Sequence, residues 1–184
     1  TPAAPASIYA STKLMQEYLL TQGFWGSETH VGLMRLQNVY GPGQAMNNPY
    51  TGVLSVFATQ AAAGQNLEIF EDGAIVRDFV YVDDVVEVFV NMIETPIVTG
   101  QPIDIGSGKA ATILDAAGML LAAMDADSEA LRVTGAYRPG DVRHALADIS
   151  SAKAVLGWRP NVSLDAGLVR FAEWASAAPK SAVA

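Results

Sequence analysis

The first residues whose types and spacing could do chemistry are a tyrosine and a lysine four positions apart. Tyr9 and Lys13 belong to the segment Tyr-Ala-Ser-Thr-Lys, and on a helix this spacing places both side chains on one face. A free phenol is a poor base at neutral pH, whereas an ammonium group beside it favours the phenolate form. The pair could therefore serve as a general acid and base. A plain helix with one aromatic residue and one surface lysine is the alternative.

A second polar segment, residues 35–44, leads from an apolar stretch into a loop rich in glycine and proline. It reads RLQNVYGPGQ, so that Arg35 and Asn38 would lie at the carboxyl end of a strand, where α/β proteins commonly bind ligands. Gly41 and Gly43 do not complete the phosphate-binding pattern G-x-G-x-x-G, because position 46 is Met. A strand that simply ends in a loop competes with the binding interpretation.

Two further segments carry arginines whose positions call for a partner. Arg77 lies within an apolar run, where a charge is seldom buried alone, and its expected partner is Asp78 or an anionic ligand. Arg138 precedes a Pro-Gly turn, which would present its guanidinium to a phosphate, unless the turn is only a solvated loop. Asp83 and Asp84 are expected to cap a helix rather than to bind a metal.

Composition excludes several classes of protein. Apolar residues make up 51% and charged residues 16%, which excludes intrinsic disorder. A net charge of −8 disfavours nucleic acid as a partner. The longest run of small apolar residues, 116–124, is far shorter than the ~20 residues that cross a membrane. The chain has no cysteine, its two histidines are distant in sequence, and residues 106–109 (GSGK) lack the rest of a P-loop. A cytoplasmic protein that binds neither membrane nor nucleic acid is expected.

The elements that must position these side chains alternate between helix and strand. Strands are expected over 30–36, 67–70, 75–81, 102–106 and 145–148, with a loop over 38–50 and a turn at Asp72-Gly73. Helices are expected over 8–22, 52–64, 112–124, 150–157 and 163–176, with a further helix after Asp84. Ser7, Ser150 and Ser163 are the expected caps, and Thr112 with Asp115 has the spacing of a capping box. This alternation favours an α/β fold with parallel strand pairing.

In their order along the chain, the motifs resemble the extended short-chain dehydrogenase/reductase family, and within it the NAD-dependent nucleotide-sugar epimerases and dehydratases. The resemblance covers residues 7–176 and rests on YxxxK, RLxNVYGP, FxDGxxxRDFVxVxDV, RPGDV, AD and LGWxP. The loop 47–54 is similar to that of UDP- or dTDP-sugar 4-epimerases, particularly dTDP-rhamnose 4-epimerase-like members.

The resemblance implies a fold made of the terminal elements of a Rossmann-type parallel sheet and a small mixed α/β substrate-binding domain. Residues 1–50 would end the dinucleotide-binding domain. Residues 51–184 would form mainly the substrate-binding domain, with some segments returning to the Rossmann sheet. Members of this family begin with a half that contains G-x-x-G-x-x-G, which this sequence lacks. The chain is therefore expected to be the carboxyl-terminal part of such an enzyme, inactive alone, whose full-length form is a homodimer.

The resemblance also implies a cofactor and a reaction. Tyr9 would be the acid/base at the sugar hydroxyl, Lys13 would hold the nicotinamide ribose of NAD, and the backbone of Leu36 would touch the nicotinamide end. The implied function is epimerisation of a UDP- or dTDP-hexose through transient oxidation to a keto-sugar. A 4,6-dehydratase, a reductase of the same family, and an inactive nucleotide-sugar-binding or dimerising fragment remain the alternatives.

On the substrate side, the resemblance assigns six residues to the nucleotide sugar: Asn38, Val53, Ile69, Arg77, Arg138 and Asp141. The two arginines and Asn38 would bind the diphosphate, and the main chain of Val53 would lie beside it. Asp141 would lie near the nucleotide ribose, and residues 67–70, with Ile69 among them, would line the base pocket.

Overall fold

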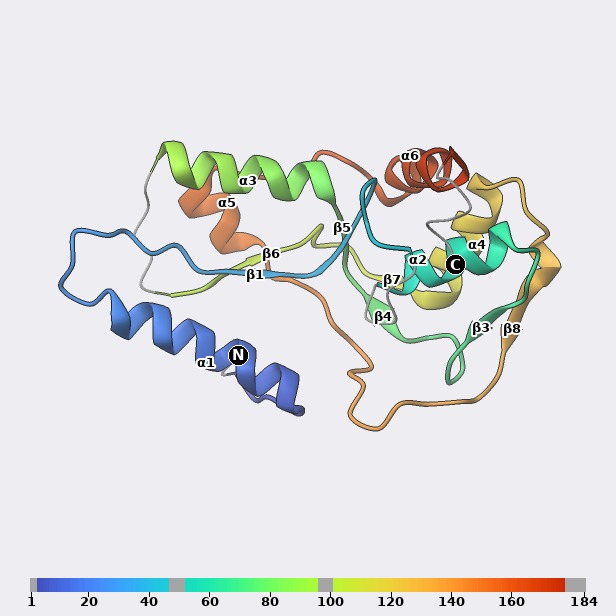
Figure 1. Ribbon diagram of the computed structural model, residues 1–184, viewed down its shortest axis with the longest axis horizontal. Helices are drawn as coiled ribbons and strands as arrows, with labels where there is room; N and C mark the ends of the chain where they lie inside the picture. Colours follow the sequence, from blue (N-terminus) through green and yellow to red (C-terminus); the bar gives the residue numbers. More distant parts are fainter. Residues whose placement is uncertain (1–2, 47–51, 96–100, 178–184) are drawn as a thin grey trace.

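A computed structural model describes residues 3–46, 52–95 and 101–177 (Figure 1). The α-helices are α1 (Ile8–Gly23), α2 (Val53–Ala62), α3 (Val82–Glu94), α4 (Ile113–Ala123), α5 (Ser150–Leu156) and α6 (Leu164–Ala177). The strands are β1 (Met34–Leu36), β2 (Asn38–Tyr40), β3 (Leu67–Ile69), β4 (Val76–Arg77), β5 (Phe79–Tyr81), β6 (Ile103–Ile105), β7 (Ala111–Thr112) and β8 (Leu131–Val133). A short 3₁₀ helix, Ser128–Ala130, precedes β8.

The strands pair mostly in parallel. β1 pairs with β6, β2 with β5 and β3 with β8 in parallel, whereas β4 and β7 are antiparallel. Helices separate the partners along the chain, as parallel pairing requires. Figure 1 shows α1 on one side of β1 and β6, with α3 and α5 on the other side. The expectation of an α/β fold with parallel strands is confirmed.

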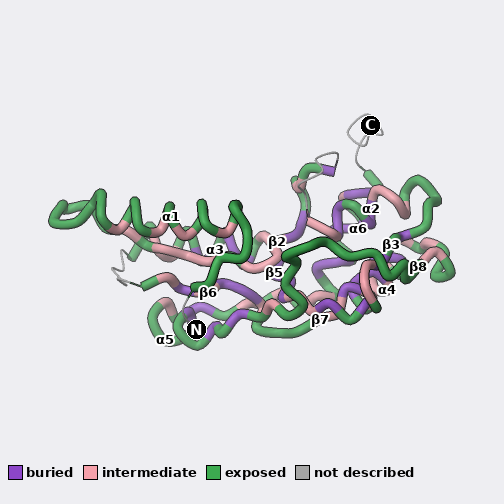
Figure 2. The backbone as a smooth tube through the Cα atoms, turned by 90° about the horizontal axis from the view of Figure 1, so that it is seen from below, coloured by how far each residue is buried: buried purple, intermediate pink, exposed green. Residues whose placement is uncertain are grey.

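The β2–β5 pair separates two hydrophobic cores. All three residues of β5 are buried, and successive side chains of a strand point to opposite faces. Phe79 and Tyr81 accordingly join the core formed with α2, α4 and α6, while Val80 joins the core beneath α3 and α5. Figure 2 shows this burial as purple segments along the middle of the molecule, whereas α1 is largely exposed. A strand buried on both faces explains the continuous apolar run in the sequence.

The single strand expected over 75–81 is wrong, because Asp78 divides it. The Asp78 carboxylate is fully buried and accepts hydrogen bonds from the amide and hydroxyl of Ser107 (both 2.6 Å), from Gly108 N (3.0 Å) and from Ala147 N (3.2 Å). Gly106 allows this approach, since a β-carbon there would lie 2.5 Å from Asp78 Oδ2. The carboxylate thus joins β5 to the β6–β7 connection and to the segment before α5.

The sequence predicted helix caps correctly where the capping side chain bonds an amide a few residues ahead of it. Ser7 Oγ accepts from Ala10 N, and Thr112 Oγ1 accepts from Asp115 N at 3.0 Å, as expected. Ser163 lies ahead of α6, where its hydroxyl accepts from Ala166 N. Ser150 was expected to cap α5, but it is the first residue of that helix, and the cap position is Ile149, which forms no side-chain hydrogen bond to the helix.

Asp83 and Asp84 lie at the N-terminal end of α3, as expected, but the expectation that they cap this helix is wrong. The cap position is Tyr81, and both aspartates lie in the first turn. The buried Asp84 carboxylate instead accepts from the backbone amides of Asn161 (2.9 Å) and Val162 (3.1 Å), and its carbonyl accepts from Trp158 Nε1. Asp84 therefore holds the connection between α5 and α6.

Three other local expectations differ from the structure. The strand over 30–36 is restricted to β1, and the start of the expected loop 38–50 is β2, because it pairs with buried β5. Residues 145–148 form no strand; the nearest pairing is a single bridge between Val76 and His144. β3 and β4 flank the turn at Asp72-Gly73 but pair with other strands. Residues 47–51 of the loop compared with 4-epimerases lie outside the described residues.

Candidate functional site

Tyr9 and Lys13 lie together near the start of α1, as their spacing predicts. The Tyr9 side chain is 71% exposed, and Lys13 Nζ lies 5.7 Å from the centre of its ring. Lys13 Nζ also donates to Gln16 Oε1 at 3.4 Å, a long bond at an exposed position. The phenol and the ammonium are therefore both accessible to a ligand.

A bidentate ion pair connects this helix to the parallel strands. Arg35 Nε and Nη2 each donate to a different oxygen of Glu17, both at 2.7 Å. The hydrogen bond to Glu17 raises the pKa of Arg35. Sequence analysis did not identify Glu17, because nothing in a helical carboxylate marks its partner 18 positions away. Leu36 follows Arg35 at the end of β1 and is partly exposed, while Asn38 begins β2.

Arg77 pairs with Asp141, so the expectation of Asp78 as its partner is wrong. Arg77 Nη2 lies 2.6 Å from Asp141 Oδ1, and Arg77 Nη1 donates to the carbonyl oxygens of Val76 and Val142. The Arg77 side chain is only 12% exposed. Two residues expected to bind different parts of one ligand thus bind each other.

Arg138 has a different environment. Its guanidinium lies 5.3 Å from the centre of the Phe70 ring, an exposed cation–π contact, and it forms no ion pair within the part of the chain that the structure describes. The turn that follows lies next to the segment before α1, since a β-carbon on Gly140 would lie 3.7 Å from the Ala6 carbonyl oxygen. The RPGD segment therefore lies between Arg77 and the start of the Tyr9 helix.

The remaining two candidates lie elsewhere. Val53 begins α2 after Gly52, which provides no side-chain cap, and the amide of Ser55 donates to the Gly52 carbonyl at 3.0 Å. Ile69 is fully buried in the core, and its carbonyl accepts from the amide (2.9 Å) and hydroxyl (3.3 Å) of Thr134. The Ile69 side chain therefore packs in the core, and its assignment to a base pocket stays a prediction. Of its neighbours, Glu68 and Phe70 have more accessible side chains.

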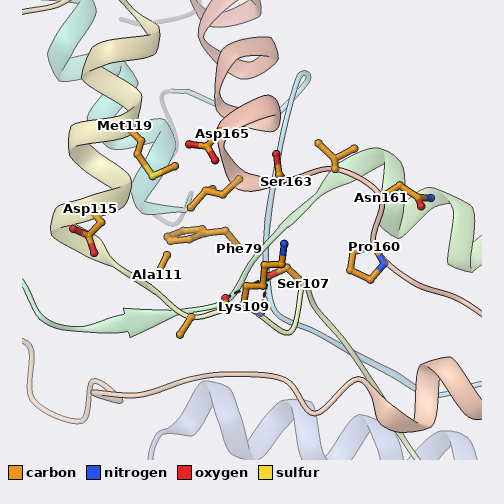
Figure 3. Close-up of a pocket in the computed structure, with 13 residues that line it drawn as sticks. Phe79, Ser107, Lys109, Ala111, Asp115, Met119, Pro160, Asn161, Ser163 and Asp165 are labelled. Atoms are coloured by element: carbon orange, nitrogen blue, oxygen red, sulfur yellow. Dashed lines mark hydrogen bonds between the residues drawn. The ribbon is translucent and has the colours of Figure 1, made fainter.

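The structure also contains a partly open pocket of about 400 Å³ that the sequence did not indicate (Figure 3). It is lined by residues of β5, of the β6–β7 connection, of α4 and of the segment before α6. Phe79 forms its apolar wall, and Lys109, Asp115 and Asp165 contribute charges. None of the nine predicted site residues is among its described lining residues. A second, open hollow of about 630 Å³ follows residues 5–15 and includes Ser7, next to Tyr9.

Residues 3–46, 52–95 and 101–177 contain no group of three or more His, Asp or Glu side chains that could hold a metal ion. No helix within these ranges is both long and apolar enough to cross a membrane.

Comparison with known proteins places this geometry in context. Residues 1–106 match the sequence model of the NAD dependent epimerase/dehydratase family. The chain is 41% identical, over 174 residues, to a dTDP-L-rhamnose 4-epimerase of Burkholderia thailandensis, covering 95% of this chain and 47% of that protein. It is 32% identical to a UDP-glucose 4-epimerase of Mycolicibacterium smegmatis, and that match covers 94% of this chain and 54% of that protein. The chain therefore spans about half the length of the curated relatives it matches.

Solved structures agree with these relatives. A Bacillus cereus UDP-glucuronic acid 4-epimerase in complex with UDP-glucuronic acid and NAD superposes with a TM-score of 0.82 at 31% identity, covering 94% of this chain and 53% of that one. A Thermus thermophilus UDP-glucose 4-epimerase complex with NAD gives a TM-score of 0.85 at 26% identity, covering 97% and 57%. The α/β arrangement thus matches that of epimerases over about half their length.

Proposed function

The chain belongs to the NAD dependent epimerase/dehydratase family, and from this premise we propose that it serves the epimerisation of a UDP- or dTDP-hexose through transient oxidation to a keto-sugar. The 41% identity to a dTDP-L-rhamnose 4-epimerase supports epimerisation over dehydration or reduction. Turnover is proposed for the complete protein that contains these residues, because the chain covers only half of each relative.

The observation that carries this proposal is the convergence of three motif segments. A β-carbon on Gly140 of the RPGD turn would lie 3.7 Å from the carbonyl oxygen of Ala6, so this turn lies next to the segment that leads into the helix with Tyr9 and Lys13. The same turn supplies Asp141 to Arg77 at 2.6 Å. A possible acid/base and two guanidinium groups are thereby held around one connection, although they lie far apart in sequence. This combination suits a substrate with a reactive hydroxyl and an anionic diphosphate.

The roles of the two α1 residues follow from their exposure. The accessible Tyr9 phenol would take the proton from the sugar hydroxyl that becomes a ketone and later return it. The Lys13 ammonium, close to the ring and held only by Gln16, would stabilise the phenolate and donate to ribose hydroxyls. These groups, with the backbone of Leu36 at the end of β1, fit the nicotinamide end of NAD, which when bound supplies hydride transfer.

Residues 1–184 by themselves are expected not to bind NAD at micromolar concentration. The pyrophosphate of a dinucleotide normally binds a glycine-rich turn at a helix N-terminus, and no G-x-x-G-x-x-G occurs in this sequence. Isothermal titration calorimetry with NAD measures this directly. A longer protein that includes such a turn is the control, and micromolar binding by residues 1–184 alone would contradict the expectation.

On the substrate side, the two arginines are expected to contribute differently. Beyond its contact with the Phe70 ring, the Arg138 guanidinium forms no ion pair among the described residues, so its hydrogen-bonding capacity is available to a diphosphate. Arg77 already donates to Asp141 and to two carbonyls, so it also holds the RPGD segment in place. A ligand that engages Arg77 must share it with Asp141.

Substitution of these arginines tests the proposed function. Arg138→Ala should weaken UDP or dTDP binding several-fold to hundreds-fold without lowering thermal stability, since charge-assisted hydrogen bonds contribute about 1.5–3 kcal/mol. Arg77→Ala should weaken binding and also lower stability. Arg→Lys at either position should restore little, because an ammonium cannot form the planar fork. NAD affinity of the complete protein should not change.

The exposed Arg132 is a matched control, because among the described residues its guanidinium bonds only to the nearby carbonyls of Glu129 and Leu131. Arg132→Ala should leave nucleotide affinity unchanged. The diphosphate assignment is wrong if both Arg138→Ala and Arg77→Ala lower stability while nucleotide affinity stays constant. Analysis of the sugar product then distinguishes the epimerase from a dehydratase or reductase, because only epimerisation conserves the composition of the substrate.

A further inference from the structure

We propose that Arg143 is a positioning residue: with Glu71 and Asp72 it forms a clamp that holds the arm, residues 134–147, so that Arg138 faces the substrate. This inference rests on the proposed function and adds a residue that the diphosphate assignment does not include. In Figure 1 the arm is the orange connection that leaves β8, passes β4 and continues to α5. None of its residues between β8 and α5 belongs to a helix or a strand, so contacts with other elements must set its course.

The clamp is a forked ion pair. Arg143 Nη1 lies 2.5 Å from Glu71 Oε2, and Arg143 Nη2 lies 2.6 Å from Asp72 Oδ2. The hydrogen bond between Arg143 and Asp72 is the largest cause of a raised pKa at Arg143 and a lowered pKa at Asp72. A guanidinium that bonds two carboxylates fixes its own orientation better than a single exposed pair does.

Glu71 bonds to both ends of the loop that contains Arg138. Its side chain bonds Arg143, and its backbone amide donates to the carbonyl of Ala136 at 2.7 Å. Residues 137–142, including Arg138, lie between these two attachments. Glu71 has a φ of 52°, a left-handed conformation that costs a non-glycine residue free energy. The contacts with the arm compensate this cost, so Glu71 closes the loop at its base.

The clamp lies directly beside the contact that orients Arg138. Phe70, whose ring faces the Arg138 guanidinium at 5.3 Å, precedes Glu71 in the chain. The Arg143 backbone extends the attachment, because its carbonyl accepts from Val76 N at 2.8 Å. Breaking the side-chain fork should therefore loosen residues 137–142 while the backbone pairing at Val76 keeps the fold.

The test uses the complete protein with the variants Arg143→Ala and Arg143→Lys. Arg143→Ala should raise KM for the nucleotide sugar about three- to tenfold and leave kcat within twofold, because Arg138 is misplaced while Tyr9 is not. Arg143→Lys should recover part of the loss, because an ammonium can bond one carboxylate at a time. Amide hydrogen exchange in residues 137–142 should become faster in Arg143→Ala and not in the control Arg132→Ala.

A double-mutant cycle separates positioning from general destabilisation. In an Arg138→Ala background, Arg143→Ala should have almost no further effect on KM, because the residue it positions is gone. An equal increase in both backgrounds would overturn the proposal, as would unchanged exchange in residues 137–142. Glu71→Gln, which keeps the side-chain shape and removes one charge, should give a smaller effect of the same kind.

The outcomes also separate the clamp from the proposed function. If the complete protein binds and converts no UDP- or dTDP-sugar, the proposed function is wrong. The exchange measurement then still decides whether Arg143 holds the arm. If exchange increases while nucleotide affinity stays constant in a protein that does bind the nucleotide, Arg143 holds the arm without positioning Arg138, and the inference fails.

Discussion

Replacement of Tyr9 by phenylalanine in the complete protein is expected to lower kcat by about 10²–10⁴-fold, the usual contribution of general acid/base catalysis. The substitution removes the phenolic proton and keeps the ring. Tyr9 is exposed on α1 and packs into neither core, so that folding should be unaffected. Affinity for the nucleotide sugar should stay nearly constant, because the two arginines proposed to bind the diphosphate are unchanged.

Steady-state kinetics with calorimetry of nucleotide binding measures both quantities. Tyr18→Phe is the matched control: Tyr18 is on the same helix and 58% exposed, but it lies nine positions from Tyr9. Its kcat should equal that of the wild type. If Tyr9→Phe retains half of the wild-type kcat, Tyr9 is not the acid/base and the role of α1 must be reconsidered.

Replacement of Asp78 by alanine is expected to lower the free energy of unfolding by about 3 kcal/mol or more, because it leaves buried donors without an acceptor. Ser107 donates two hydrogen bonds to this carboxylate, and Gly108 and Ala147 donate one each. The donors come from two separate segments. The β6–β7 connection and the segment before α5 should therefore loosen together. The turn that carries Arg138 should be displaced with the segment before α5.

Urea unfolding followed by circular dichroism measures this loss. Asp83→Ala provides the control, because Asp83 is an exposed aspartate five positions away whose main effect is on the α3 dipole, about 0.3–1 kcal/mol. Asp78→Asn should lower the free energy of unfolding by an amount between those of Asp83→Ala and Asp78→Ala, since an amide retains one accepting oxygen. Equal stability of Asp78→Ala and Asp83→Ala would show that the Asp78 network contributes no net stability.

The sequence predicted best what depends on neighbours along the chain. Ser7 and Thr112 cap their helices because a hydroxyl reaches an amide three residues ahead whatever surrounds it. Tyr9 and Lys13 meet because helical geometry alone brings positions four apart together. The order of the motifs was specific enough to imply the family, which the match over residues 1–106 confirms.

The sequence was a poor guide to the partners of charged residues. Arg77 has Asp78 beside it in the chain, but the buried Asp78 carboxylate accepts its hydrogen bonds from Ser107, Gly108 and Ala147 instead. Asp141, 64 positions away, meets Arg77 instead, and Glu17 meets Arg35 across two elements. The clamp formed by Arg143 with Glu71 and Asp72 was not predicted either, because its residues are 71 and 72 positions apart in the sequence.

The helices, the face that carries Tyr9 and Lys13, the parallel α/β class and the family could thus be predicted from the residues alone. The sequence did not show that Asp78 and Asp84 bind distant backbone amides, that the Ile69 side chain belongs to the core, or that Arg77 forms an ion pair whereas Arg138 forms none among the described residues. The difference lies in the distance along the chain between the groups that interact. Caps and helical faces are set by backbone geometry within a few residues, whereas the partner of a charge depends on which distant segments hydrophobic burial brings together.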